Sequence, residues 1–143
     1  MSNRKIIIII VMIFLVVLGP TLLLSNLGLG IIQGFVDKNP KGSAAPWFQY
    51  TLGNIYYYTL RPEKAADSFK TYNDRYSESK DQRYWNAMYF RALSLDDAGK
   101  TRDAAPLFME YYYTCPRNDP NRPEVKKECL RLRHHLPMFT PDD

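Results

Sequence analysis

The sequence predicts an all-α protein with a single N-terminal transmembrane helix, two helical hairpins and a C-terminal capping helix. Residues 6–36 contain no charged side chain and consist mainly of Ile, Leu and Val. From Trp47 onward, apolar residues recur at spacings of three and four, which is the helical period, and no stretch alternates as a strand would. A pattern of paired helices also repeats at an offset of 39 residues.

The N-terminal apolar segment predicts a membrane anchor over residues 1–36. Residues 6–32 number 27, and a helix of that length reaches about 40 Å, more than the ~30 Å hydrocarbon core of a bilayer. The alternative is a cleaved secretory signal, because Arg4 and Lys5 precede an apolar core that stops before Pro20. The chain stays apolar beyond Pro20, where a cleavage region would be small and polar, so we expect an uncleaved anchor.

The end of this segment carries small residues on one helical face. Asn26, Gly30 and Gly34 recur every four residues, a spacing typical of close contacts between transmembrane helices. We therefore predict that this face packs on a partner helix. The alternative is a chance match, because glycine is common in such helices.

A linker over residues 37–46 leads into a predicted helical domain over residues 47–143. Pro62 is placed to open the second helix and Gly99 to end the third. Pro106 indicates that the fourth helix starts late, with Asp103 as its N-cap, or bends. The residues expected to line the five helices are Phe48, Leu52, Ile55 and Thr59; Ala65, Phe69, Tyr72 and Tyr76; Tyr84, Met88, Ala92 and Leu95; Ala104, Ala105, Phe108 and Tyr111; and Val125, Cys129, Leu132 and Leu136.

The stretch YYYT occurs twice, at residues 56–59 and 111–114, but the two copies fall on the first and fourth helices and are not equivalent. The offset of 39 is the better duplication, because it superposes similar residues throughout both hairpins. The pairs are Gly53 with Ala92, Ala65-Ala66 with Ala104-Ala105, Phe69 with Phe108, Tyr72 with Tyr111, and Ser77 with Pro116.

These residues resemble the tetratricopeptide repeat over residues 47–116. The first copy is carried by Leu52-Gly53, Tyr56, Ala65, Phe69 and Tyr72, and the second by Ala92, Gly99, Ala104, Phe108 and Pro116. The long spacing is similar to the extended repeat of periplasmic proteins in bacterial envelope assembly, with Tyr76-Ser77-Glu78-Ser79 as its turn. Arg91 and Ser94 depart from the pattern, because they stand at positions that are normally apolar. The resemblance implies a scaffold of packed hairpins.

Localisation follows from the resemblance and from charge. Arg4 and Lys5 with the terminal amine slightly outweigh Lys38 and Lys41 on the other side of the apolar segment. We expect a single-pass protein of the bacterial inner (cytoplasmic) membrane, with its N-terminus in the cytoplasm and its helical domain in the periplasm.

The expected function is that of a non-catalytic, membrane-anchored accessory or assembly subunit, a scaffold acting by protein–protein interaction within a larger membrane complex. Its expected partners are the lipid bilayer and an integral membrane protein complex, of which an energy-transducing complex is one example. No nucleic acid is expected, because residues 42–143 carry a net charge of only +1. No small-molecule substrate is expected, because the sequence contains no catalytic constellation and no Gly-rich phosphate loop. The alternative function is a receptor that captures a peptide or protein on the concave repeat surface.

No catalytic, cofactor-binding or metal residues are predicted. The only two histidines, His134 and His135, are adjacent and would project about 100° apart on a helix. The tyrosine content is the more informative feature, because eleven tyrosines exceed what two hairpins need for a core. Tyrosine is common at protein interfaces, and the candidates that fall largely off the apolar stripes are Tyr57, Tyr58, Tyr89, Tyr112 and Tyr113.

The two cysteines, Cys115 and Cys129, are a candidate disulfide. The bond would close a loop of about 15 residues and require an oxidising compartment. The alternative is a small buried thiol at Cys129, which shares the apolar face of Val125 and Leu132.

Overall fold

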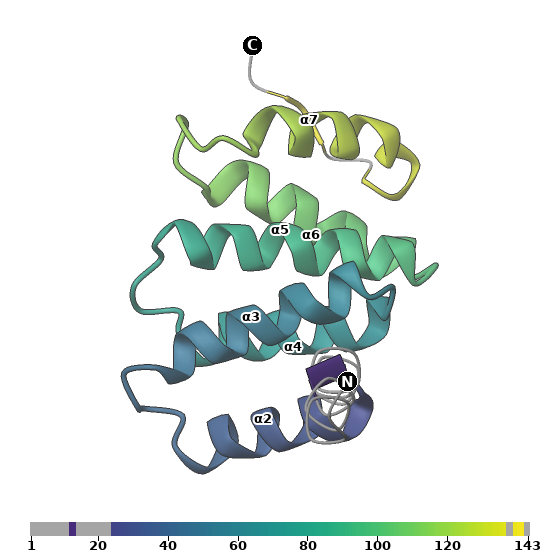
Figure 1. Ribbon diagram of the computed structural model, residues 1–143. Coiled ribbons are helices and arrows are strands. Elements are labelled where there is room, and N and C mark those ends of the chain that lie inside the picture. The colour runs from purple at the N-terminus through teal and green to yellow at the C-terminus, as the bar shows by residue number, and fades with distance from the viewer. Residues whose placement is uncertain (1–11, 14–23, 137–138, 142–143) are drawn as a thin grey trace, which may run out of the picture. The chain divides into compact units, whose positions relative to one another are not determined.

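The computed structural model describes residues 12–13, 24–136 and 139–141, and all regular structure in these ranges is helical (Figure 1). The chain divides into two compact units, Met1–Asn39 and Pro40–Asp143. Consecutive helices of the second unit run antiparallel, an arrangement compatible with a helical-repeat fold.

The first unit contains the helix α2 (Asn26–Lys38), which has 13 residues and is therefore about 20 Å long. Ser25 precedes it with an extended backbone (φ −66°, ψ 161°), and the Ser25 hydroxyl accepts a hydrogen bond from the Gly28 amide at 3.2 Å. This is an N-cap, which begins a helix and does not continue one.

The prediction of a single transmembrane helix over residues 6–32 is therefore wrong. Within the described ranges, every helix is too short or too polar to cross a membrane. The prediction rested on the apolar character of the segment and did not take into account that Ser25 caps α2 within the predicted span. The remainder of the predicted span, residues 6–11 and 14–23, lies outside the described residues.

The second unit contains the five helices predicted after residue 46. Proline occupies the first turn of three of them, where its missing N–H is tolerated, and Asp81 caps another by accepting a hydrogen bond from the Tyr84 amide at 3.0 Å. The helices are α3 (Ala45–Tyr58), α4 (Pro62–Arg75), α5 (Gln82–Asp97), α6 (Thr101–Thr114) and α7 (Arg122–Arg131), followed by the short 3₁₀ helix η1 (Arg133–His135).

The fourth predicted helix does not start late. It is α6, which begins at Thr101, so Pro106 lies inside it. The proline cannot donate a hydrogen bond to the Arg102 carbonyl, but both residues are exposed, and solvent can satisfy that carbonyl.

Two turns close the hairpins α3–α4 and α5–α6, and their hydrogen bonds repeat at the offset of 39. Leu60 donates to the Tyr57 carbonyl at 3.2 Å and Arg61 to that of Tyr56 at 2.9 Å. In the second turn, Gly99 donates to Asp96 at 2.9 Å and Lys100 to Leu95 at 2.8 Å. Both are Schellman turns, in which one residue adopts a left-handed conformation.

The core repeats at the same offset. The equivalent pairs Ala65 and Ala104, Phe69 and Phe108, and Tyr72 and Tyr111 are all at most 2% exposed. Small residues at the first pair allow the helices of each hairpin to approach closely, and the aromatic residues fill the space between hairpins.

Phe69 joins the two hairpins. Its ring stacks on that of Phe90 from α5, with centroids 5.8 Å apart and planes at 21°, and meets Tyr50 of α3 edge-on at 5.9 Å. On its remaining side lies Gly53, where an added Cβ would stand 2.6 Å from the Phe69 Cε1 atom. Only glycine fits there without moving the ring.

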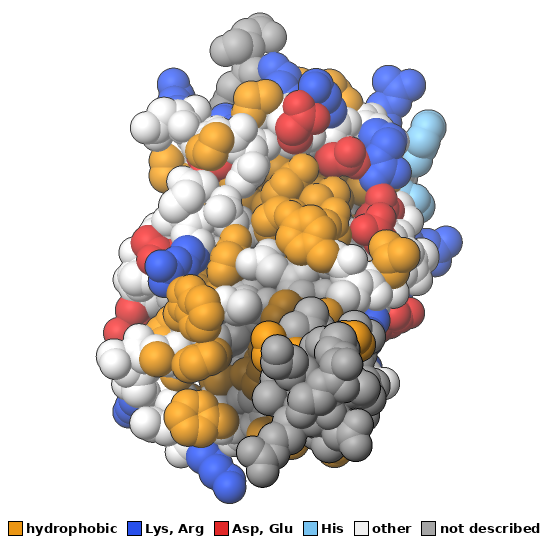
Figure 2. Space-filling model, viewed as in Figure 1, with side chains coloured by type: hydrophobic (Ala, Val, Ile, Leu, Met, Phe, Trp, Pro, Cys, Tyr) orange, Lys and Arg blue, Asp and Glu red, His pale blue; other side chains and the backbone are white. Residues whose placement is uncertain are grey.

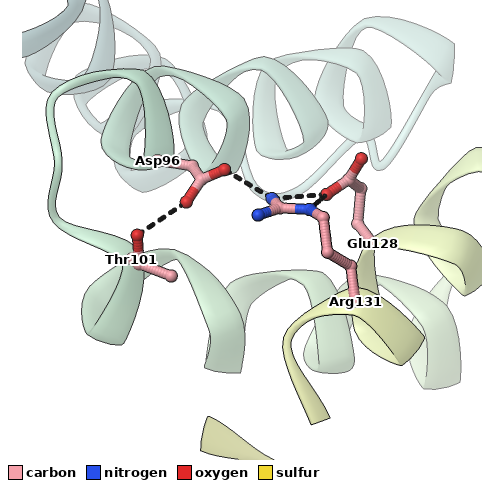
Figure 3. A network of polar contacts seen from close by, with 4 residues as sticks. All are labelled: Asp96, Thr101, Glu128 and Arg131. Carbon is pink, nitrogen blue, oxygen red and sulfur yellow. Dashed lines mark hydrogen bonds and ion pairs between the residues drawn. The ribbon is translucent and has the colours of Figure 1, made fainter. Parts of the chain in front are cut away.

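The capping helix α7 packs on α6 through Val125, Cys129 and Leu132, all at most 4% exposed. Its C-terminal end is also tied to the α5–α6 turn by Arg131, which bridges Asp96 and Glu128 (Figure 3). The Thr101 hydroxyl donates to the second carboxylate oxygen of Asp96 at 2.8 Å. Because Arg131 is half exposed, these ion pairs contribute little to the free energy of unfolding. Their main effect is to fix the orientation of α7 against the α5–α6 turn.

We expect Gly53→Ala to lower the free energy of unfolding by about 1–3 kcal/mol, the usual effect of overpacking, although alanine favours a helix by about 1 kcal/mol over glycine. The Phe69 ring cannot yield, because Tyr50 and Phe90 hold its other sides. Urea denaturation measures the effect. Gly30→Ala is the matched control, because an added Cβ meets nothing within 4 Å there. Equal stability of Gly53→Ala and the parent chain would contradict this packing.

Candidate interaction surface

The structure distributes the five tyrosines predicted to bind a partner among three environments. Tyr58, at the end of α3, is 72% exposed, and Tyr113, at the end of α6, is 48% exposed. Tyr57 and Tyr89 are half-buried, and Tyr112 is buried. They therefore do not form one continuous exposed surface.

Tyr57 and Tyr89 pack against aromatic residues of the joint between the hairpins. The Tyr57 ring meets Phe90 at 5.1 Å, and the Tyr89 ring meets Phe108 at 6.4 Å and Tyr111 at 6.2 Å. Burial raises the pKa of both phenols, and Asp97 adds to this effect at Tyr57. Both side chains therefore stay neutral at physiological pH and serve chiefly as packing groups.

The face seen in Figure 2 carries a cluster of hydrophobic side chains between α5 and α7, with acidic side chains at its edge. Glu124 and Glu128 of α7 lie near enough to Tyr89 to contribute to its raised pKa. Tyr89 and Leu93 of α5 are partly buried and pack against the core that contains Phe108. We interpret the hydrophobic cluster on this face as the exposed margin of that core.

Tyr112 and Tyr113 contact their own chain. Tyr112 packs on Phe139 at 5.3 Å and lies under the Arg122 guanidinium at 4.2 Å. The Tyr113 hydroxyl donates to the Thr140 carbonyl at 2.9 Å and accepts from the Thr140 amide at 3.2 Å. The C-terminal segment therefore contacts two of the five tyrosines that the sequence analysis assigned to a partner.

The α3–α4 turn presents the most exposed apolar side chain among the described residues. Leu60 is 88% exposed and has a φ of +56°, a conformation that favours glycine because the Cβ of other residues crowds the backbone. Tyr58 stands beside it, its ring packed edge-on against Tyr57 at 5.4 Å. We call Tyr58 and Leu60 the turn surface.

Sequence reasoning missed Leu60, although a signal was present. The offset of 39 aligns Leu60 with Gly99, and Gly99 has the same left-handed backbone with a φ of +76°. The second hairpin therefore has the residue that the turn prefers, and the first hairpin has a leucine in its place.

The predicted helix-packing face of Asn26, Gly30 and Gly34 lies on α2. An added Cβ at Gly30 or Gly34 would meet no atom of the described residues within 4 Å, so both positions have room for a small side chain. The adjacent Leu27, Ile31 and Phe35 recur every four residues and are 74%, 68% and 62% exposed. Packing of this face on a partner helix stays a prediction.

Cys115 and Cys129 are both free and buried, so the disulfide predicted between them is not formed in the structure. Burial, with a contribution from Glu128, raises the pKa of Cys129 to about 12. The Cys115 sulfur lies 3.7 Å from the Arg122 Nη1, but burial dominates and raises the pKa of this thiol as well.

No group of three His, Cys, Asp or Glu side chains suited to a metal ion occurs in the part of the chain that the structure describes. His134 and His135 lie exposed in η1. The expectation of a non-catalytic chain without cofactors stays a prediction.

Comparison with known proteins adds no assignment. No protein-family model matches the sequence, and no curated protein matches it.

We expect Leu60→Gly to raise the free energy of unfolding by about 1 kcal/mol, because glycine relieves the left-handed strain and the exposed leucine contributes little packing. The reverse change at the equivalent position, Gly99→Leu, should lower it by a similar amount. Thermal or urea denaturation of the two variants measures both effects. A loss of stability in Leu60→Gly would show that the leucine supports the fold.

Proposed function

We propose that this chain is a non-catalytic scaffold or accessory subunit, which binds a partner protein through the turn surface. The observation that carries the proposal is the exposure of Leu60, 88%, in a backbone conformation that disfavours leucine. Exposed apolar groups at such positions are a sign of function, because the fold itself gains nothing from them.

The energetics support a bound partner. Full burial of a leucine side chain stabilises by about 2 kcal/mol, and that gain is absent at Leu60 in the chain alone. Tyr58 adds a large ring with few rotatable bonds and a hydroxyl for hydrogen bonding, which is the usual profile of an interface residue. Together they form a small anchor for an apolar pocket on a partner.

The hairpins are proposed to be tetratricopeptide-type repeats. The repeat of 39 residues, the small side chains where helices cross and the aromatic joint at Phe69 support this assignment. Repeats of this kind present surfaces for protein binding and have no chemistry of their own.

A place in a larger assembly is supported by α2. Its stripe of Leu27, Ile31 and Phe35 is exposed in the chain alone, and contiguous exposed apolar side chains mark contact sites. The identity of that assembly as a bacterial inner-membrane complex, with the helical domain in the periplasm, stays a prediction. So does the alternative function of a receptor that captures a peptide or protein on the concave repeat surface.

The test is purification of the tagged full-length chain from its native cells under gentle detergent conditions, with co-purifying chains identified and quantified. We expect one partner at fixed stoichiometry, retained at least about tenfold less by Leu60→Gly, since loss of a buried leucine corresponds to more than 1.4 kcal/mol. Leu130→Ala is the control, because Leu130 is also exposed, at 46%, but lies on α7.

Because Leu60→Gly is expected to fold at least as well as the parent, reduced retention would not arise from unfolding. Unchanged retention of the partner by Leu60→Gly, or an equal loss in Leu130→Ala, would contradict binding through the turn surface.

A further inference from the structure

The helix α2 exposes apolar side chains on one side and buries them on the other. Leu27, Ile31 and Phe35, which we call the α2 stripe, are 74%, 68% and 62% exposed. Leu29 and Val36 are each only 1% exposed, and the helical period places them on the side of α2 opposite the stripe. The first unit therefore packs α2 through one side and leaves the stripe to contact another molecule.

The third side of α2 is polar. It carries Asn26, Gln33 and Asp37, and the Gln33 side-chain amide donates a hydrogen bond to the Asp37 carboxylate at 3.0 Å. A helix with an exposed apolar stripe beside a polar side is suited to a boundary between an apolar phase and water.

Apolar exposure in the first unit is not confined to the stripe. The residues that join α2 on its N-terminal side, 6–23, contain no charged side chain, and the two of them that the structure describes, Met12 and Ile13, are each 58% exposed. The side chains of the stripe itself have no hydrogen-bonding group. A bilayer offers an apolar phase to all of these residues, whereas a groove on a protein partner would cover only one helix face.

Charge near the stripe is complementary to anionic lipid. Lys38 is exposed in the last turn of α2, and the helical period places it on the same side as the stripe. Lys41, also exposed, follows three residues later. Asp37 is the only acidic residue among residues 24–41 and lies on the polar side. A lysine can lay its alkyl chain along apolar surface and reach a headgroup with its ammonium.

We infer that α2 binds along the surface of a lipid bilayer that contains anionic lipids, with the α2 stripe among the upper acyl chains and Lys38 at the headgroups. The helix lies along the surface and does not cross it, because its 13 residues reach about 20 Å, less than the ~30 Å hydrocarbon core. This inference names the occupant of the stripe for which the proposed function assumes an assembly, and it is independent of the turn surface.

The test is NMR of the full-length chain, methyl-labelled at Ile and Leu, in nanodiscs of phosphatidylcholine with a quarter of phosphatidylglycerol. Part of the lipid carries a nitroxide just below the headgroup or, in a second sample, at the end of the acyl chain. We expect the Leu27 and Ile31 methyl signals to be broadened most by the nitroxide below the headgroup. The methyl signals of the buried Leu29 are the internal reference and should be broadened less.

Ile31→Gln places an amide in the middle of the stripe and keeps a good helix former. It should lower the population of lipid-bound α2 about tenfold, seen as loss of the Leu27 broadening, because the burial of an isoleucine side chain is lost. Gly30→Gln is the matched control, because Gly30 lies off the stripe and an added Cβ there meets no described atom within 4 Å. It should leave the Leu27 broadening unchanged.

Lys38→Gln tests the preference for anionic lipid. It should reduce the Leu27 broadening in the mixed nanodiscs and have no effect in nanodiscs of phosphatidylcholine alone, because only the mixed lipid attracts the ammonium group. An equal effect in both lipids would overturn the assignment to anionic headgroups.

Three results would overturn binding of α2 along the bilayer surface. The first is equal broadening of the Leu27 and Leu29 signals, or unchanged broadening in Ile31→Gln. The second is strongest broadening by the nitroxide at the end of the acyl chain, which would place α2 in the bilayer interior. The third is shielding of Leu27 and Ile31 from both nitroxides and from a gadolinium chelate in the buffer, which would show that protein covers the stripe. Leu60→Gly should leave these signals as in the parent chain, so failure of this inference and failure of the turn surface are seen separately.

Discussion

The close approach of Gly53 to the Phe69 ring is the contact on which the second unit depends. Glycine at this point lets α3 lie against α4, and the ring is then held between Tyr50 and Phe90. Because Phe90 belongs to α5, the contact within the first hairpin also fixes the position of the second. The joint therefore also positions the α3–α4 turn and the exposed end of α3.

Much of the second unit could be predicted from the sequence. Apolar spacing located α3 to α7, and the offset of 39 paired Phe69 with Phe108 before their burial was known. The predicted transmembrane helix failed because a single polar residue, Ser25, caps α2 within an apolar stretch. Tyr112 and Tyr113 were assigned to a partner because they fall largely off the apolar stripes. Their contacts with Phe139 and Thr140 join residues far apart in sequence, and helical periodicity carries no information about such contacts.

The second hairpin serves as an internal reference for the first. Where the two agree, as at Ala65 and Ala104, the residues are buried and their role is packing. Where they differ, as at Leu60 and Gly99, the first hairpin has a strained leucine in place of the glycine that the turn favours. We interpret this difference as a contact point for a partner protein.

Hydrogen–deuterium exchange of the full chain, free and bound to its co-purified partner, tests this interpretation most directly. The Tyr57 to Arg61 turn should become protected on binding. The equivalent turn of the second hairpin, Asp96 to Lys100, should exchange as it does in the free chain. Equal protection of both hairpins, or protection confined to the second, would contradict the claim that the first hairpin is the binding element.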